Sequence, residues 1–523
     1  MLVVTTAAAS PSTTAAAQTQ PPAPVVAPAP RFFECSVADA ACVPPSLVRE
    51  FRGVWLATVG NMDWPSRPGL HPDSARLELT RLLDHAAATG LNAVIFHVRP
   101  AGDALYASTI EPWSEYLTGR QGLAPAPPWD PLAFAVTEAH ARGLELHAWF
   151  NPYRAKDPTS KGPLAAQHLA RRNPGYAMRY GRYTWFDPGE PAVRRHTVRV
   201  VLDVLNRYDV DGIHVDDYFY PYPEQRRGRD IPFPDATRFR RYQRAGGTLE
   251  LDDWRRNNVD VLIDTLHTEI AKAKPWVKFG ISPFGIWRPG EPARVRGLDA
   301  FARIYADAKK WLENGWVDYL VPQLYWTIDA DGQPFAELLR WWIAQNAKAR
   351  HVWPGLADYK IGESRTTWRS DEILRQIDTT RAVVAVGNRG TTPGAVHFQM
   401  TALVKDRGGV STLLAQRSYA TRALVPASPW MGDSRPGTPG IAVATSRMGD
   451  VLIFARRSIA DVRWWAVQAR SGESWTTHLI DGAQNEAPLA RFAGTGGGPA
   501  EILAVAAVSR TGVAGAPVAI RVR

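Results

Sequence analysis

The sequence predicts an α/β protein in which a (β/α)8 barrel, the TIM-barrel architecture, is followed by a small C-terminal β-sandwich. Short apolar runs and amphipathic segments alternate eight times over about 350 residues, which is the repeat number of a closed barrel. Beyond about residue 420, short alternating runs lie between turn residues, a pattern typical of an all-β module. An open doubly wound sheet is the alternative for the first part, but it would need a glycine-rich phosphate turn that the sequence lacks.

Eight apolar runs are the expected barrel strands, with helical patterns between them. Segments 74–90 and 130–143 have apolar residues at three- and four-residue spacing, and each ends at a glycine suited to a helix C-cap. Asp73 and Ser74 are natural N-caps for the first helix. The eight expected strands lie in FRGVWLATV (51–59), NAVIFHVRP (92–100), LELHAWFNP (144–152), DGIHVDDYF (211–219), VKFGISPFG (277–285), VDYLVPQLYW (317–326), VWPGLADY (352–359) and AVHFQMTAL (395–403).

Changes in amino-acid composition along the chain predict the domain boundaries. Residues 1–32 are rich in Ala and Pro and predict a signal remnant and a disordered linker, with the barrel over 33–420 and the sandwich over 421–523. The start, MLVVTTAAASPSTTAAAQ, resembles the tail of a secretory signal but has no basic segment before it. No stretch of about twenty apolar residues occurs, so no transmembrane segment is expected. We therefore expect an exported protein that is periplasmic, associated with the cell envelope or secreted.

The two cysteines, Cys35 and Cys42, lie close together before the first barrel strand. This spacing favours a local disulfide formed in an oxidising compartment. Free thiols or a lipid-modified thiol are the alternatives.

The C-terminal segment begins with the linker VPASPWMGDSRPGTPG and continues as short strand-like runs. Their close spacing predicts an immunoglobulin- or fibronectin-like sandwich. Because the segment has no cluster of acids or histidines, we interpret it as an accessory module for packing or binding.

Charge and aromatic content bear on the class of partner. The net charge is +10, yet the sequence has no run of five Lys or Arg, no zinc-finger spacing and no RNA-binding aromatic motif. We therefore expect a solvated basic surface and no nucleic-acid partner, with attraction to an acidic wall polymer left open. Of the 20 Trp, most lie in the barrel segment, where they serve either as core residues or as platforms for sugar rings.

The strongest candidate site lies at the end of the fourth expected strand, where Asp216 and Asp217 are adjacent. Function in this barrel belongs at the carboxyl ends of the strands. Side chains alternate along a strand, so if Gly212 faces the barrel axis, His214 and Asp216 do too. Asp217 then points toward the helices, although the curve into the loop lets it reach the rim. We predict that both aspartates are catalytic, with a supporting role for Asp217 as the alternative.

Paired carboxylates with aromatic walls suit glycoside hydrolysis, which needs no cofactor. Adjacent carboxylates cannot easily flank a scissile bond, so they fit a mechanism in which the sugar's own 2-acetamido group attacks. A zinc site made by His97, His147, His214 and Asp216 is the alternative, but no H-x-H or H-E-x-x-H spacing occurs. We expect neither a metal nor a cofactor.

Polar and aromatic residues after the other strands are candidate substrate-binding groups. Arg99 and Arg154 suit hydroxyls or a carboxylate such as a lactyl group, or they pair with the aspartates. The tryptophans suit sugar stacking, with core packing as the alternative. Asp358, which could instead pair with Lys360, is a reserve acid together with Glu111 and Glu115. The candidate substrate-binding residues are His97, Arg99, Trp149, Asn151, Arg154, His214, Tyr218, Trp287, Gln323, Tyr325, Trp326 and Asp358.

Six motifs in order, from about residue 48 to 405, resemble the glycosyl-hydrolase-like 10 family. The resemblance implies a (β/α)8 barrel, often with a C-terminal fibronectin-like module, in an exported or lipid-anchored bacterial protein. The family includes a divisome-associated glycosidase that cuts peptidoglycan strands without stem peptides, so cell-wall or divisome proteins are possible partners. The motifs are EFRGVWLATV, NAVIFHVRPAGDALY, PWSEYLTG, WDPLAFAVTEAHARGLELHAWFNPYR, DGIHVDDYFYP and VPQLYW.

A more distant similarity is to the chitinase signature DGxDxDxE, which aligns with DGIHVDDY. Asp216 takes the place of the last Asp, but Tyr218 stands where the acid Glu would be. This departure makes Asp217 the nearest candidate for the acid. The QLYW segment is similar to the chitinase strand whose tyrosine contacts the acetamido group.

These observations predict an exported hydrolase of N-acetylhexosamine-containing glycan, with peptidoglycan strands as the expected substrate. A non-catalytic scaffold that binds cell-wall glycan is the alternative from another class. A hydrolase of a glucosamine exopolysaccharide is the alternative with another substrate.

Overall fold

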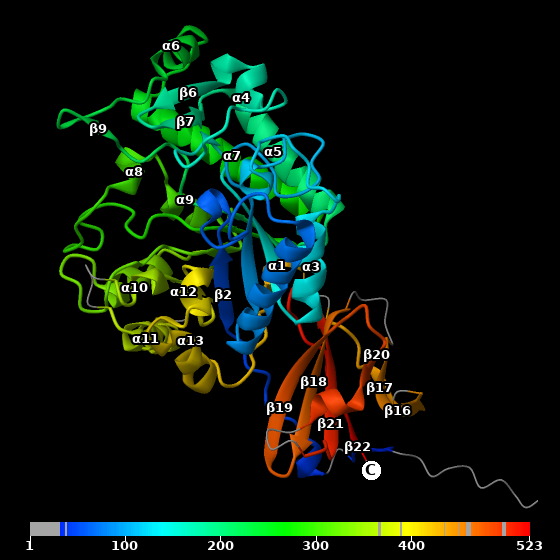
Figure 1. The fold of residues 1–523 in the computed structure, drawn as a ribbon. Coiled ribbons are helices and arrows are strands. Elements are labelled where there is room, and N and C mark those ends of the chain that lie inside the picture. Colours follow the sequence, from blue (N-terminus) through cyan, green and yellow to red (C-terminus); the bar gives the residue numbers. More distant parts are fainter. Residues whose placement is uncertain are drawn as a thin grey trace, which may run out of the picture.

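The computed structural model describes residues 32–36, 39–363, 368–387, 390–432, 435–447, 449–456, 462–493 and 498–522. The predicted signal remnant and linker over 1–32 lie outside these residues except for Phe32. The chain forms a barrel with a smaller body of strands beneath it (Figure 1).

A parallel sheet with the order β13-β12-β11-β8-β4-β3-β2-β15-β14 forms the barrel. Its two outer segments, β13 and β14, are consecutive in the chain and separated only by Trp353 and Pro354. Proline has no N–H to give to a ladder, so one strand is divided into two segments there. The sheet therefore closes on itself with eight strand positions, which confirms the predicted (β/α)8 barrel. The segments are β2 (Phe51–Leu56), β3 (Ala93–Arg99), β4 (Glu145–Phe150), β8 (Gly212–Val215), β11 (Lys278–Ile281), β12 (Tyr319–Leu320), β13 (His351–Val352), β14 (Gly355–Leu356) and β15 (Gly394–His397).

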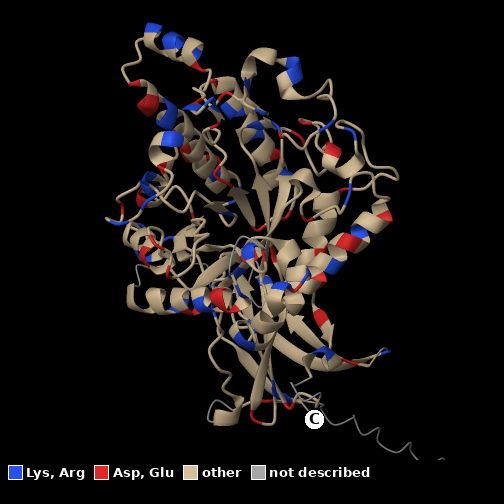
Figure 2. Cartoon of the chain, turned by 60° about the vertical axis from the view of Figure 1, so that its left-hand side comes forward, with Lys and Arg blue, Asp and Glu red and all other residues tan. Residues whose placement is uncertain are grey.

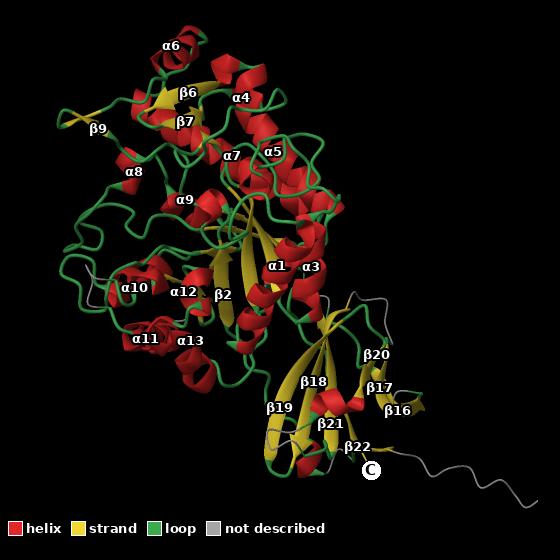
Figure 3. Ribbon diagram, in the orientation of Figure 1, coloured by secondary structure: helices red, strands yellow, loops and turns green. Residues whose placement is uncertain are grey.

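Helices surround these strands (Figure 3). The first, α1, begins at Pro72 and is capped by His71, so Asp73 and Ser74 lie inside it rather than at its N-cap as predicted. The predicted closing glycines, Gly90 and Gly143, have φ of 86° and 71°, which glycine adopts without strain. The longer helices are α1 (Pro72–Ala88), α3 (Pro131–Ala141), α5 (Pro191–Arg207), α6 (Ala236–Arg244), α7 (Leu251–Ala273), α9 (Ala308–Asn314), α10 (Phe335–Ala344) and α11 (Ser370–Gly387), and the short ones are α2 (Glu115–Thr118), α4 (Leu169–Arg172), α8 (Ala300–Arg303), α12 (Met400–Val404) and α13 (Val410–Leu413).

Large rings fill the inside of the barrel, and glycines on facing strands make room for them. A Cβ on Gly212 would lie 2.4 Å from His147 Nδ1, and one on Gly280 would lie 1.9 Å from Cζ of Tyr319. Gly212 therefore faces the barrel axis, as the alternation along β8 predicts. Val215 belongs to the apolar layer between strands and helices.

Two long excursions of the chain build up the carboxyl side of the barrel. One follows β4 and forms a three-stranded antiparallel sheet, and the other follows β8 and forms a hairpin and α6. Their strands are β5 (Arg154–Lys156), β6 (Ala177–Tyr180), β7 (Tyr183–Phe186), β9 (Gln225–Arg226) and β10 (Arg229–Asp230).

The C-terminal body consists of a five-stranded and a three-stranded antiparallel sheet. Leu452 and Phe454 of one sheet pack in a common core with Trp465 and Val505 of the other, so the body is a β-sandwich as predicted. Its likeness to immunoglobulin or fibronectin modules stays a prediction. The sheets contain β1 (Phe32–Glu34), β22 (Val518–Val522), β21 (Ile502–Ser509), β18 (Val462–Ser471) and β19 (Ser474–Asp481), and β16 (Gly440–Ser446), β17 (Gly449–Ala455) and β20 (Glu486–Pro488).

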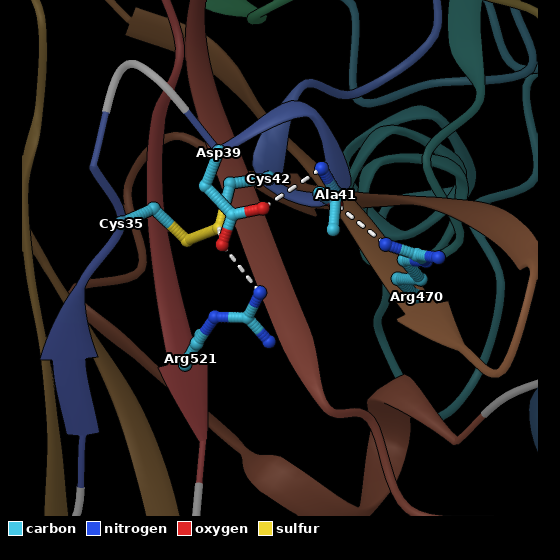
Figure 4. The surroundings of a disulfide bond; sticks show 6 residues. All are labelled: Cys35, Asp39, Ala41, Cys42, Arg470 and Arg521. Carbon is cyan, nitrogen blue, oxygen red and sulfur yellow. Dashed lines mark hydrogen bonds and ion pairs between the residues drawn. A yellow bond between two sulfur atoms is a disulfide. The ribbon is translucent and has the colours of Figure 1, made fainter.

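The first described residues belong to the sandwich and not to the barrel. Strand β1 pairs with β22, so the residues after 33 complete the C-terminal body and the barrel begins near β2. Cys35 and Cys42 form the predicted local disulfide (Figure 4). Arg470 donates to Ala41 O at 2.8 Å, and Arg521 pairs with Asp39, which ties the disulfide loop to the sandwich.

The sandwich covers the amino-terminal end of the barrel strands and leaves the carboxyl ends free (Figure 1). Arg463 of β18 pairs with Asp211, which directly precedes β8, at 2.8 Å. Trp430 donates to Asp318 just before β12, also at 2.8 Å. Lys and Arg are interspersed with Asp and Glu over both bodies (Figure 2). Within the described part of the chain, no helix combines the length and apolar character needed to cross a bilayer.

Candidate active site

A cavity of about 240 Å³ lies at the carboxyl end of the barrel, and both Asp216 and Asp217 line it. A larger cavity between α5 and α7 has no carboxylate in its lining, so it offers no acid chemistry. We call the first one the Asp216 cavity. Its lining residues are Trp55, Ala57, Val59, Met62, Trp149, Arg154, Asp216, Asp217, Tyr218, Tyr222, Ser282, Gln323, Tyr325 and Phe398.

Asp216 directly follows β8 and is held by two N–H donors. Its Oδ2 accepts from Trp149 Nε1 and its Oδ1 from the Tyr218 backbone N–H, both at 3.2 Å. Burial, together with the charge of Asp217, raises the pKa of Asp216 to about 8, against the opposing effect of Arg154. Asp216 therefore holds a proton at neutral pH.

Asp217 also lines the cavity, because the chain curves into the loop at this point. Its Oδ2 accepts a hydrogen bond from the hydroxyl of Tyr222. Burial raises the pKa of Asp217, while Tyr222 and Gln323 favour its ionised form. Two buried carboxyls that repel each other in one cavity hold a single proton between them near neutral pH, which provides one acid and one carboxylate. The catalytic roles themselves stay predictions.

Arg154 supplies positive charge beside the pair. Its guanidinium lies over the Tyr218 ring at 4.0 Å, and it is 3% exposed. Among the described residues, its ion-pair partner is Asp157, at 3.6 Å from Nε. The terminal nitrogens are thus available to a ligand in the cavity.

Five of the twelve candidate substrate-binding residues line the Asp216 cavity: Trp149, Arg154, Tyr218, Gln323 and Tyr325. Two others support this set from behind. His97 stacks on Trp149 with ring centroids 3.8 Å apart, and Asn151 Oδ1 accepts from Trp149 Nε1 at 3.2 Å. The structure therefore places His97 and Asn151 where they orient Trp149, out of reach of a ligand.

The other candidates lie outside the cavity lining, and each has a partner in the protein. Arg99 forms a buried ion pair with Glu111 at 2.6 Å. Glu111 is one of the reserve acids, so this pair also occupies that carboxylate. Asp358 pairs with His397 at 3.0 Å, so the expected pairing with Lys360 is not the one that the structure shows.

The remaining aromatic candidates are half-buried and contact other rings, and the last reserve acid is buried. Trp287 stacks on Trp341 and donates to Asp307, and Trp326 packs edge-on against Phe284. Glu115 accepts from the Gly162 N–H at 3.1 Å and is buried. These residues shape the surroundings of the site from outside the Asp216 cavity.

Seven further residues line the cavity and were not among the candidates: Trp55, Ala57, Val59, Met62, Tyr222, Ser282 and Phe398. The position of Trp55 could have been predicted from the sequence, because the alternation of side chains along its strand places it inside the barrel. Tyr222 follows the aspartates within a tyrosine- and proline-rich loop, and only the folded loop shows that its hydroxyl reaches Asp217.

A column of buried polar side chains runs along the barrel axis up to the floor of this cavity. Trp55 Nε1 donates to His214 Nε2 at 3.2 Å, and Ser282 Oγ lies 3.0 Å from the same nitrogen. His214 Nδ1 lies 3.1 Å from the hydroxyl of Tyr319, which lies 2.7 Å from His147 Nδ1.

The lower end of the column determines the direction of each hydrogen bond. His147 Nε2 lies 3.0 Å from the Glu145 carboxylate, which Lys278 also contacts at 2.9 Å. An ionised carboxylate only accepts, so His147 donates through Nε2 and accepts from Tyr319, which in turn accepts from His214 Nδ1–H. His214 is then neutral, in agreement with a pKa held well below its usual range by burial. The column holds Trp55 and Ser282 in place, and it engages two of the three histidines of the zinc alternative.

Removing the Tyr319 hydroxyl is expected to destabilise the protein and to disturb the cavity floor. Tyr319→Phe leaves a ring nitrogen of His147 and one of His214 without partners, which costs about 1–3 kcal/mol of unfolding free energy. Urea unfolding measures this loss, and glycan hydrolysis measures the effect on kcat. Tyr208→Phe removes a hydroxyl that donates to Asp130 in the outer layer and is the control. Equal kcat values for the two variants would show that the column does not position the site.

No group of three His, Cys, Asp or Glu side chains within the described ranges could hold a metal ion. His97, the third histidine of the zinc alternative, is stacked on Trp149. The arrangement therefore suits acid–base chemistry by two carboxyls with aromatic walls and one guanidinium.

The chain is similar to known glycosyl hydrolases over most of its length. The model of the family described as glycosyl hydrolase-like 10 matches residues 50–371. The chain is 37% identical over 446 residues to glycosyl hydrolase YngK of Bacillus subtilis, covering 82% of this chain and 85% of that protein. It is 34% identical over 373 residues to glycosyl hydrolase DigH of Escherichia coli K12, covering 65% and 83%.

Among solved structures, the catalytic domain of a β-amylase from Paenibacillus polymyxa aligns with a TM-score of 0.49 and 12% identity, covering 72% of this chain and 100% of that one. The extent and identity of the sequence matches carry the assignment: the chain belongs to the glycosyl hydrolase-like 10 family.

Proposed function

We propose that the protein is an exported glycoside hydrolase that cleaves N-acetylhexosamine-containing glycan, with peptidoglycan strands as its substrate. The observation that supports this most is the pair of adjacent carboxyls, Asp216 and Asp217, which share one cavity and hold one proton between them. Relatives that are named glycosyl hydrolases support the reaction class. The disulfide supports export, because such bonds persist in oxidising compartments.

The proposed reaction uses the substrate's own acetamido group. The protonated carboxyl gives its proton to the glycosidic oxygen as the bond to the anomeric carbon breaks, and the acetamido oxygen attacks that carbon. The ionised carboxylate accepts the acetamido N–H and offsets the positive charge of the cyclic intermediate. Water then opens the ring, giving one proton back to the first carboxyl. Gln323 and Tyr325 line the same cavity as polar partners for the acetamido group.

The aromatic rings that line the Asp216 cavity and the guanidinium of Arg154 suit a hexosamine that carries an acid group. Trp55 and Trp149 line the cavity with indole rings, and indole suits the C–H face of a pyranose. The planar fork of Arg154 matches a carboxylate in two-pronged geometry, as a lactyl group on the sugar would present. This favours peptidoglycan over a neutral or cationic glucosamine polymer.

A panel of three glycans tests the proposal: peptidoglycan without stem peptides, chitin oligomers and a partly deacetylated glucosamine polymer. We expect the wild type to release new reducing ends from denuded peptidoglycan. In Arg154→Lys, we expect the KM for denuded peptidoglycan to rise more than the KM for chitin. Turnover of the glucosamine polymer alone would identify an exopolysaccharide hydrolase. Binding to sacculi without release from any glycan would identify a non-catalytic scaffold. Cell fractionation tests export, and pull-down tests association with cell-wall or divisome proteins.

A further inference from the structure

The loop after the two aspartates is a wall between two cavities. Tyr218 and Tyr222 face the Asp216 cavity. Between and beyond them, Tyr220, Pro221 and Pro223 line a second cavity of about 330 Å³, which we call the Tyr305 cavity. The two cavities are therefore separated by the thickness of one loop.

The floor of the Tyr305 cavity is aromatic. The ring of Tyr220 packs edge-on against Tyr305, with centroids 5.0 Å apart, and against Phe233, at 5.1 Å. Tyr180 of β6 also lines the cavity. Proline and tyrosine faces of this kind suit the C–H faces of a sugar ring.

Planar polar groups stand at the edge of this floor. Arg255 pairs with Asp235 at 2.6 Å and donates to the Tyr305 hydroxyl at 2.6 Å. Arg303, which is exposed, pairs with Asp230, and both line the cavity. Guanidinium and carboxylate groups beside aromatic faces provide donors and acceptors for sugar hydroxyls.

Tyr305 has an unusual backbone conformation at this place. Its φ is 54°, in the left-handed region that bulky residues rarely adopt. The bond from Arg255 to its hydroxyl holds the ring against Tyr220 in spite of this strain. Strained residues gather at ligand sites, where the surrounding structure maintains them for a purpose other than stability.

We propose that the Tyr305 cavity is a second sugar subsite, so that one glycan chain crosses the Tyr218–Pro223 wall and occupies both cavities. This inference rests on the proposed function, because it takes the Asp216 cavity as the place of cleavage. A second subsite would make the protein prefer long substrates, because a long oligomer gains contacts in the Tyr305 cavity that a short one cannot reach. The ligand at this subsite is a neutral N-acetylhexosamine unit of the chain, bound through stacking and hydroxyl contacts.

Variants of the cavity and oligomers of different length test this. For Tyr305→Ala and Arg303→Ala, we expect kcat/KM for a chitin hexasaccharide to fall about tenfold relative to that for an aryl N-acetylhexosaminide. This is the loss of roughly one stacked ring for Tyr305 and one charged hydrogen bond for Arg303. Arg296→Ala removes an exposed arginine paired with Asp331 outside both cavities and is the control. An unchanged ratio in both cavity variants overturns the subsite.

Direct binding separates failure of the subsite from failure of the proposed function. Titration calorimetry compares the affinity of the chitin hexasaccharide for the wild type, Arg303→Ala and Arg296→Ala without any turnover. Weaker binding by Arg303→Ala alone supports the subsite even if no glycan is cleaved. Equal binding by all three proteins rejects it even if hydrolysis is observed. Arg303 lies at the surface, so Arg303→Ala is expected to fold and still tests the subsite if Tyr305→Ala unfolds.

Discussion

Asparagine in place of either Asp216 or Asp217 is expected to lower kcat by about 10²- to 10⁴-fold, the range measured for loss of a general acid or base. The change keeps the shape of each side chain and its place in the cavity. It removes the proton donor in one variant and the charge that stabilises the intermediate in the other. Release of reducing ends from denuded peptidoglycan measures the loss. Full activity in both variants would contradict the assignment of the site.

The leaving group distinguishes the two roles. An aryl glycoside with an acidic phenol needs little proton assistance, so the variant that lacks the acid keeps much of its rate on this substrate. The variant that lacks the orienting carboxylate loses rate on every substrate, because attack by the acetamido group is impaired. The proton held by Asp216 and the donation by Tyr222 to Asp217 predict that Asp216→Asn is the variant rescued by the acidic phenol, whereas the chitinase similarity favours Asp217 as the acid.

The pH dependence follows from the same carboxyl. With a pKa of about 8 for Asp216, kcat/KM is expected to fall as the pH rises through that value, since the acid is then ionised. The folded-state pKa is above the unfolded value, so the stability that the protonated form contributes is lost as the pH rises toward 8. Asp216→Asn should therefore be more stable than the wild type at pH 9 and similar at pH 4 in urea unfolding. An exposed substitution, Asp371→Asn, is the control.

The barrel and the position of the aspartates could be predicted because both depend on local regularities. Eight apolar runs predict eight strands. Side chains alternate between the two faces of a strand, which places Gly212, His214 and Asp216 on one face. The carboxyl ends of parallel strands meet at one edge, so Trp149, Gln323 and Tyr325 come together with the pair without further information. Asp217 needed one more consideration, the curve of the chain after β8.

Pairings between distant residues could not be predicted in the same way. Arg99 is a plausible ligand group in the sequence, but Glu111, in the loop after β3, reaches back and pairs with it. Asp358 follows β14 and meets His397 at the end of the neighbouring strand β15. Consecutive barrel strands are expected to be neighbours, but no local pattern shows which side chains pair across them. The role of β1 was missed for a similar reason: a three-residue strand pairs with the far end of the chain.

The second large effect is expected at the opposite end of β8, where Arg463→Met should lower the free energy of unfolding by about 3–5 kcal/mol. Asp211 is buried there and accepts from His140 at 2.9 Å and from the Leu146 N–H at 2.8 Å, in addition to Arg463. Burial alone would raise the pKa of Asp211, but Arg463 and His140 more than offset it and hold the pKa well below its usual range. Removing the guanidinium leaves a buried charge without its main partner.

The matched control lies in the same interface. Arg510 pairs with Asp209 at 2.7 Å, but Asp209 is exposed, so Arg510→Met should cost no more than about 1 kcal/mol. Equal losses in the two variants would show that burial of the Asp211 pair has no special effect. Adding Asp211→Asn to Arg463→Met should restore part of the loss, since the unpaired charge is then gone.

The effect of Arg463→Met also has a predicted pH dependence. A carboxyl whose folded-state pKa is depressed contributes its stability above the unfolded pKa and loses it as the pH falls through the folded value. The difference between wild type and variant should therefore be full at pH 7 and shrink only in strong acid. Because the pair joins the sandwich to the base of the strand that carries Asp216 at its other end, kcat at 25 °C should persist in Arg463→Met while the half-life of activity on heating shortens. A fall in kcat under conditions where the variant is folded would instead mean that the sandwich acts on the site through β8.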